Sequence, residues 1–297
     1  MPSEGCLAGS PSGLEDLVGD RRNFFATYWA KEPAIFDSNA DLSSLISETE
    51  IWNELECGLL SRPYFTVFNE GVRSAIHSIT TTRVVAGHRL NGFADVDQIK
   101  AEFAQGGTFK LSQVEHWHKA IKSLVNGLRD SFAGNLEAFV FLSPPGKTAM
   151  RAHTDGAHVF VLQIAGEKDW VVGRLNESSH SNSTLHEGEI DPDNRLEFTL
   201  RAGQVLYMPH GCPHYATART GNSIHLAITI EEPTAMDMAN VILANFMATE
   251  TFAALEKSHH QLPMPDKIQR LSTSFQQFLI DRDIETMLRE SIELRKR

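Results

Sequence analysis

The stretch RAHTDGAHVFVLQIAGEKDW, residues Arg151–Trp170, contains the pattern that decides the fold. It places His153 and Asp155 two residues apart at the start of a segment with the composition of a β-strand. Side chains at positions i and i+2 of a strand point to the same side of a sheet. An imidazole and a carboxylate on one side can share a metal ion, so we expect a third ligand from a later strand.

The candidates for the third ligand are the histidines that follow in the sequence: His158, His180, His186, His210, His214 and His225. The segment GQVLYMPHGCPHYATA favours His214, because Pro209 and Pro213 predict a tight turn and His214 would begin the strand after it. Two histidines and one carboxylate match the facial triad of non-haem Fe(II) oxygenases, which leaves coordination positions open. His210, within the same turn, stays open as an alternative ligand or a substrate contact.

The hydrophobicity pattern divides the chain into a tail, a β-rich region and a helical end. Residues 1–16 are rich in Gly, Ser and Pro, and we expect a flexible tail there. From about residue 136, short β-type segments alternate with Gly, Pro, Asn and Ser turns, which is typical of a double-stranded β-helix such as the jelly roll or cupin. We therefore expect a mainly β domain with surrounding helices over residues 17–235 and a helical region over residues 236–297.

Charge and composition exclude several classes of protein. The formal net charge is −11, so the surface repels phosphate backbones and we expect no nucleic-acid partner. No apolar run approaches the roughly 18 residues of a membrane span, and the N-terminus lacks the basic and apolar regions of a signal peptide. Cys6, Cys57 and Cys212 lie far apart, which favours a reducing compartment. We expect a cytoplasmic protein without a membrane partner.

Several motifs in one order resemble a known family. His153-Thr154-Asp155 is followed by VFVLQIAGEKDW, then GQVLYMPHGCPHYATA, then SIHLAITI. Together they resemble the cupin-type JmjC oxygenases, and within these the ribosomal oxygenases and their bacterial relatives. FFATYWAKEPAIF near the N-terminus resembles the opening helix and following segment of that group. The resemblance covers roughly residues 20–235.

The resemblance implies an oxygenase that uses Fe(II), 2-oxoglutarate and O2 to hydroxylate an unactivated C–H bond, with release of succinate and CO2. It implies His153, Asp155 and His214 as the metal ligands and catalytic centre. It places Lys168 at the distal carboxylate of 2-oxoglutarate and Thr229 beside it as a hydroxyl partner. The position of Lys168 after the AGE turn agrees, because a dianion that chelates the metal needs a cation at its far end.

Two departures from the family bear on the substrate. Relatives carry a polar residue, often Tyr, on the strand before the HxD motif; with Phe141 at that position a hydrogen bond to the cosubstrate is lost or comes from elsewhere. Residues 236–297 have the length for the family's helical dimerisation region but not for the winged-helix domain of the bacterial members. We therefore expect a homodimer that acts on an amino acid or other small metabolite, or on a peptide or protein. The polar segment Arg174–Asn194 predicts a loop near the mouth with substrate contacts.

Two other function classes stay open on the sequence alone. A cupin enzyme could use the same three ligands without 2-oxoglutarate, and it would then not need Lys168. A non-catalytic binding module could keep the barrel and lack turnover. The complete HxD…H set argues against the binding module, because a decayed site would have lost a ligand.

Overall fold

A computed structural model of the chain describes three stretches: residues 9–175, 183–184 and 190–295. The chain divides into two compact units. The first unit comprises Met1–Phe132 and Leu136–Glu231, and the second comprises Ala133–Asn135 and Glu232–Arg297.

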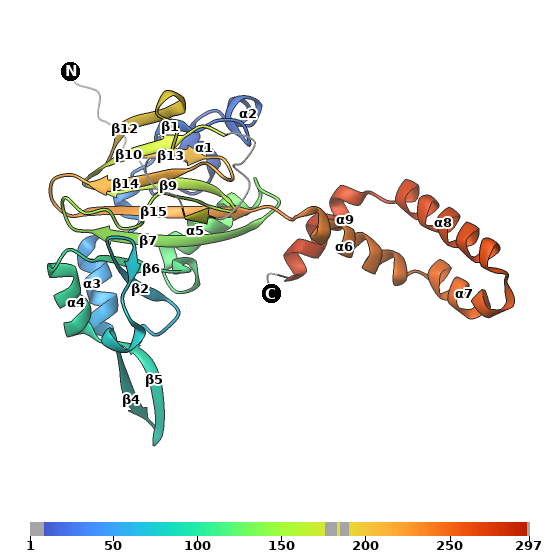
Figure 1. The fold of residues 1–297 in the computed structure, drawn as a ribbon, viewed down its shortest axis with the longest axis horizontal. Helices are drawn as coiled ribbons and strands as arrows, with labels where there is room; N and C mark the ends of the chain where they lie inside the picture. Colours follow the sequence, from blue (N-terminus) through green and yellow to red (C-terminus); the bar gives the residue numbers. More distant parts are fainter. Residues whose placement is uncertain (1–8, 176–182, 185–189, 296–297) are drawn as a thin grey trace. The chain divides into compact units, whose positions relative to one another are not determined.

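Two antiparallel sheets face each other in the first unit and form the expected double-stranded β-helix (Figure 1). The larger sheet has, in spatial order, β1 (Ala34–Asp37), β13 (Gln204–Met208), β9 (His158–Ala165), β15 (Ser223–Glu231), β7 (Asn135–Ser143), β6 (Thr108–Leu111), β2 (Phe65–Asn69) and β3 (Val72–Arg73). The smaller sheet has β11 (Ser183–Thr184), β8 (His153–Thr154), β14 (His214–Ala218), β10 (Glu167–Gly173) and β12 (Arg195–Arg201). A separate hairpin is formed by β4 (Thr80–Val85) and β5 (His88–Ala94). The chain passes from one sheet to the other between β8 and β9 and between β13 and β14, as jelly rolls do.

Alternation along the strands gives the larger sheet two buried faces. On β9, Phe160 and Leu162 belong to the larger core, whereas Val159 and Val161 pack between the two sheets. The larger core is covered by short helices whose apolar residues repeat at helical spacing. The helices that contribute residues to this core are α1 (Leu14–Val18), η1 (Phe24–Tyr28), η2 (Leu42–Ser44), α3 (Glu48–Cys57), α4 (Val96–Ala104), η4 (Val114–His116) and α5 (Lys119–Arg129). The first unit also contains α2 (Arg21–Asn23), η3 (Ile76–Ser78) and η6 (Pro192–Asn194), which bury no residue.

The N-terminal segment contains a helix inside the stretch that the sequence predicts to be a flexible tail. Of the expected tail, residues 1–16, the first eight lie outside the described residues. Helix α1 already begins at Leu14, whose side chain is 1% exposed. Sequence reasoning missed this boundary because a five-residue helix after a Gly- and Ser-rich stretch offers too short an apolar pattern.

The second unit is helical, with α6 (Ala235–Met247), α7 (Glu250–Ser258), η7 (His259–Gln261), α8 (Met264–Asp281) and α9 (Ile284–Arg295). Its small core contains Phe246 and Phe278, whose ring centroids are 5.4 Å apart. Met264, Ile268 and Leu271 are exposed on α8 at spacings of four and three residues, so they form one apolar stripe. Among the described residues no single helix is long and apolar enough to cross a membrane. Only α6 together with α7 and η7, bent by 71° at the break, passes by length and composition.

Packing of the N-terminal segment against α5 can be tested at Gly127. A Cβ there would lie 1.7 Å from the carbonyl oxygen of Ser12. We expect Gly127→Ala to displace the segment before α1 and to lower the free energy of unfolding by about 1–3 kcal/mol, although Ala is the better helix former. Gly9→Ala is the control, because no atom lies within 4 Å of a Cβ at that position. Equal urea midpoints for the two variants would contradict this packing.

Candidate functional site

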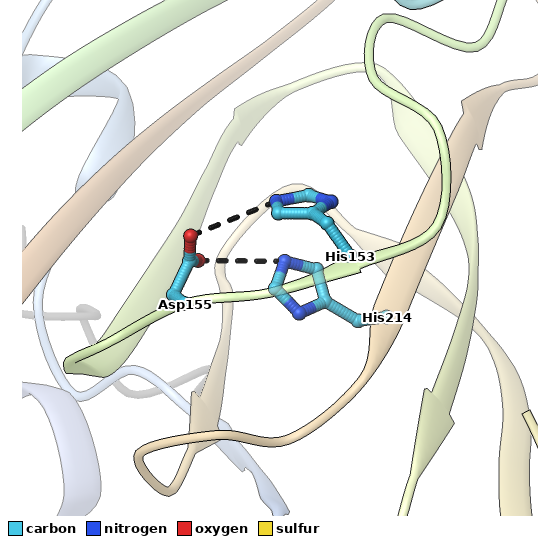
Figure 2. Close-up of side chains that lie close together, drawn as sticks. All are labelled: His153, Asp155 and His214. Carbon is cyan, nitrogen blue, oxygen red and sulfur yellow. Dashed lines mark ion pairs between the residues drawn. The ribbon is translucent and has the colours of Figure 1, made fainter. Parts of the chain in front are cut away.

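Strand pairing brings the three residues of the HxD…H pattern together. Strands β8 and β14 pair so that His153 lies opposite His214. Asp155 follows β8 in the turn before β9, and its carboxylate faces both rings (Figure 2). Nε2 of His153 lies 3.7 Å from one carboxylate oxygen, and Nε2 of His214 lies 3.6 Å from the other. The ligand atoms of the three residues all lie within 4.8 Å of one another, so the group could hold a metal ion.

Hydrogen bonds to the backbone decide which nitrogen of each histidine is free. Nδ1 of His153 lies 2.8 Å from the carbonyl oxygen of Arg151, and Nδ1 of His214 lies 3.0 Å from that of Cys212. A carbonyl oxygen only accepts, so Nδ1 carries a hydrogen in both rings, and Nε2 is the nitrogen that has the lone pair when the ring is neutral. Burial, followed by the neighbouring His214, lowers the pKa of His153 to about 4, so this ring is neutral at pH 7. A neutral ring with a free Nε2 is the form that binds a metal ion.

The turn between Pro209 and Pro213 connects Asp155 to β14. Gly211 adopts a φ of 81°, a conformation that favours glycine. Its N–H donates to the backbone carbonyl oxygen of Asp155 at 3.0 Å. Cys212 is 2% exposed, and burial raises the pKa of its thiol to about 12, so it packs as a protonated side chain. The turn therefore fixes the carboxylate relative to the strand that carries His214.

His158 and His210 belong to a different network. His158 points from β9 into the larger core, where its Nδ1 lies 2.9 Å from the hydroxyl of Tyr207. The same Nδ1 accepts the backbone N–H of His210 at 3.3 Å. Neither histidine belongs to the cluster that could hold a metal. Their hydrogen bond instead attaches the turn between Pro209 and Pro213 to the larger core.

Part of the expected mouth loop, Arg174–Asn194, is outside the described residues, including His180 and His186. Its described piece, β11, pairs with β8, and Thr184 lies opposite His153. This pairing places the backbone of Ser183 and Thr184 in the sheet that carries His153 and His214. Substrate contacts from the rest of the loop remain a prediction.

A cavity of about 290 Å³ lies beside the cluster, and Lys168 reaches its closed end. Lys168 is 2% exposed, and its Nζ donates to Oγ of Ser143 at 2.9 Å. Ser143 also accepts the hydroxyl hydrogen of Thr108 at 3.1 Å. In the part of the chain that is described, no carboxylate pairs with Lys168, and burial lowers its pKa to about 7. A buried ammonium without a counterion makes this end of the cavity a site for an anion.

Thr229 lies far from Lys168, contrary to the prediction that both hold one carboxylate. Its hydroxyl donates to the carbonyl oxygen of Glu137 at 3.4 Å, near the start of β7. Lys168 contacts Ser143 at the end of β7, and the stretch from Glu137 to Ser143 spans roughly 20 Å in an extended strand. Ser143 is therefore the hydroxyl group beside Lys168. The period-two pattern of LEAFVFLS could have identified it, because Ser143 and Phe141 share one face of the strand.

Aromatic rings form the cavity wall near Lys168. His225 stacks on Phe141 with centroids 4.6 Å apart and meets Trp170 edge-on at 5.9 Å. Burial, followed by the charge of Lys168, holds the pKa of His225 well below its usual value, so the ring is neutral. Nδ1 of His225 has no hydrogen-bond partner among the described residues. Phe141 therefore presents an apolar ring to the cavity.

The buried Lys168 predicts how stability changes with pH in the metal-free protein. Between pH 7 and about 10 the unfolded chain binds a proton at Lys168 that the folded chain has lost, so stability rises with pH. The slope reaches at most about 1.4 kcal/mol per pH unit. We expect the free energy of unfolding of the wild type to increase relative to Lys168→Met by about 1–2 kcal/mol between pH 7 and pH 9. Lys100→Met, at a half-exposed lysine, is the control, and parallel curves for wild type and Lys168→Met would contradict this assignment.

Comparison with known proteins agrees with this geometry. A family model described as the JmjC domain matches residues 118–238. The bifunctional lysine-specific demethylase and histidyl-hydroxylase NO66 of Drosophila grimshawi is 26% identical over 243 residues, covering 76% of this chain and 30% of that protein. Ribosomal oxygenase 2 of Rattus norvegicus is 26% identical over 240 residues, covering 74% of this chain and 48% of that protein. The chain therefore spans less than half the length of these relatives.

Solved structures of an Escherichia coli protein have the same fold. The X-ray structure of ycfD has a TM-score of 0.58 at 17% identity and covers 90% of this chain and 70% of that chain. The structure of the ribosomal oxygenase YcfD in complex with cobalt and 2-oxoglutarate has a TM-score of 0.54 at 15% identity and covers 90% of this chain and 68% of that chain. The double-stranded β-helix thus contains most of the segment, residues 118–238, that the JmjC domain model matches.

Proposed function

We propose that the chain is an Fe(II)- and 2-oxoglutarate-dependent oxygenase. It hydroxylates an unactivated C–H bond of an amino-acid side chain, in a free amino acid or in a peptide or protein, and releases succinate and CO2. One observation carries this proposal: a single cavity has a two-histidine, one-carboxylate cluster at its side and Lys168, a buried cation without an acidic partner, at its closed end. The names of the relatives, a histidyl-hydroxylase and a ribosomal oxygenase, and the cobalt and 2-oxoglutarate complex of the E. coli protein support it.

The donor set fits Fe(II). Two imidazole nitrogens and one carboxylate occupy one face of a six-coordinate ion and leave positions open for further ligands. The nitrogen–oxygen distances of 3.6 and 3.7 Å compare with about 3 Å between adjacent ligands at metal–ligand distances near 2.1 Å, so small side-chain rotations are sufficient. We infer that His153, Asp155 and His214 hold the ion. Together with 2-oxoglutarate and O2, the bound ion would supply the oxidising power for C–H cleavage.

The closed end of the cavity fits the distal carboxylate of 2-oxoglutarate. Lys168 offers a buried charge, and Ser143, which accepts hydrogen bonds from Lys168 and Thr108, holds the lysine Nζ at this end. An anion at this place would raise the pKa of Lys168 from about 7 and hold the ammonium charged. The rings of Phe141, Trp170 and His225 exclude water from this end.

We also infer the organisation around this site. Residues 17–235 form the catalytic domain, and residues 236–297 form a helical dimerisation region. The loop Arg174–Asn194 contributes substrate contacts, since β11 within it pairs beside His153. The names of the curated relatives favour a substrate residue in a protein, and a free amino acid remains within the same substrate class.

Succinate formation from 2-oxoglutarate tests the proposed function. With Fe(II), ascorbate and air, we expect the wild type to release succinate slowly even without substrate. His153→Ala removes a metal ligand and should lower the rate by at least about 100-fold, because even residues that only support ligands change activity by 10- to 100-fold. Lys168→Met should weaken 2-oxoglutarate binding by about tenfold or more. Lys100→Met, at a lysine outside the cavity, should match the wild type.

Different failures of this assay separate the alternatives. Substrate turnover that survives in Lys168→Met would contradict the cosubstrate site and favour a metal-dependent cupin enzyme without 2-oxoglutarate. Absence of both metal binding and succinate would favour a non-catalytic binding module.

The apolar stripe on α8 predicts self-association. Met264, Ile268 and Leu271 are exposed, and we expect a second copy of the chain to cover them. Light scattering after gel filtration should give twice the chain mass for the wild type. Leu271→Asp should shift the mass toward that of one chain, whereas Ser272→Asp, at the adjacent exposed position, should not. A wild type with the mass of one chain would contradict the dimer.

A further inference from the structure

A second lysine lines the cavity, and the proposed reaction has no role for it. Lys110 on β6 pairs with Phe141 of β7. Its Nζ lies 4.3 Å from the ring centroid of Phe139 and 5.2 Å from that of Phe141, so the ammonium group is nearer Phe139. Within the described residues Lys110 has no hydrogen bond and no ion pair. Its charge is therefore held only by ring faces and by longer-range electrostatics.

The burial gradient along β7 shows on which side of the cavity Lys110 lies. Exposure falls from the half-buried Phe139 to 8% at Phe141 and 0% at Ser143. The neighbouring strand β15 has the same gradient, from an exposed residue at its end to buried residues at its start. Lys168 contacts Ser143 at the closed end, whereas the ammonium of Lys110 lies nearer the open end. A cosubstrate bound at Lys168 would leave Lys110 facing the substrate.

The surrounding charges favour an anion at Lys110 once the metal site is filled. Burial lowers the pKa of Lys110. The negative charge of Asp155 opposes this shift most, the positive charge of Arg73 adds to it, and Glu137 opposes it less. A divalent ion would engage the Asp155 carboxylate and would add positive charge beside Lys110. Contacts with two aromatic rings offset only part of the free-energy cost of burying an ammonium group. Glu137 and Glu231 also line the cavity, but among the described residues Lys110 forms no ion pair with a carboxylate, so its charge would need a negative partner from the substrate.

We propose that Lys110 binds a carboxylate of the substrate beside the candidate metal ligands. This inference rests on the proposed function and narrows its substrate class to amino acids that present a carboxylate near the oxidised carbon. The carboxylate is the α-carboxylate of a free amino acid or the side chain of an acidic residue in a peptide. Lys110 would repel a cationic side chain, so the proposed substrate class does not include the lysine in the name of the Drosophila relative.

Binding to the full chain, loaded with Mn(II) and saturated with 2-oxoglutarate, tests this assignment by calorimetry. The probes for an α-carboxylate are the free amino acids and their α-amides. The probes for a side-chain carboxylate are doubly blocked Asp and Glu and their blocked Asn and Gln counterparts. We expect the wild type to bind one set of acids about 10- to 100-fold more tightly than the matched amides. Succinate release under air with Fe(II) should be stimulated by the same acids.

Variants of Lys110 test whether this side chain causes the preference for acids over amides. Lys110→Met should abolish the preference for acids and leave the affinity for 2-oxoglutarate unchanged, whereas Lys110→Arg should keep the preference. Lys100→Met is the matched control, because Nζ of Lys100 also lies over a ring, 5.9 Å from the centroid of Trp52, but outside the cavity. The set of acids that binds identifies the source of the carboxylate.

Three results would overturn the inference. The first is a wild type that shows no preference for acids over amides, including one that binds no acidic probe. The second is a preference that survives in Lys110→Met. The third is a loss of 2-oxoglutarate affinity in Lys110→Met, which would assign Lys110 to the cosubstrate. Failure of 2-oxoglutarate to bind the Mn(II)-loaded wild type would instead contradict the proposed function itself.

Discussion

The pairing of β8 with β14 is the constraint on which the candidate site depends. It sets His153 opposite His214, and the turn before β14 attaches the backbone of Asp155 to the same region through Gly211. Each histidine is oriented by a carbonyl oxygen two residues before it in the chain, so its tautomer is set by the fold and not by a metal ion. Strands β8 and β14 therefore present oriented imidazole donors. The strands that precede them in the chain, β7 and β13, both lie in the larger sheet.

Buried positive charge is the second feature of the cavity. Lys168 and Lys110 lie toward its closed and open ends, and apolar and neutral aromatic side chains separate them. Burying an ammonium without an acid lowers stability, and the large core on the other face of the sheet offsets this cost. A buried charge that lowers stability is expected at a binding site, where the charge serves to bind a ligand. Lys168 supplies a cation where the proposed reaction would bring the distal carboxylate of 2-oxoglutarate, and Lys110 supplies one where we infer a carboxylate of the substrate.

The repeating β-segments predicted the double-stranded β-helix, which is confirmed. The HxD…H pattern predicted the three residues that the structure brings together. Both predictions were possible because they depend on local alternation along strands and on one turn. The register between strands that are distant in the sequence could not be predicted from local patterns. The family resemblance implied Thr229 beside Lys168, whereas Lys168 contacts Ser143 at the end of β7 and Thr229 contacts Glu137 near its start. Lys110 gave no signal of its own, because it comes from a short strand far from the motif and enters the cavity only through its pairing with Phe141.

The most direct test of the central claim is calorimetric binding of 2-oxoglutarate with and without Mn(II). The metal ion and the distal carboxylate would occupy two parts of one cavity. We therefore expect Mn(II) to tighten 2-oxoglutarate binding by about tenfold or more in the wild type, and Lys168→Met to lose a comparable factor in affinity with Mn(II) present. An affinity that is independent of the metal, or equal in wild type and Lys168→Met, would contradict the account.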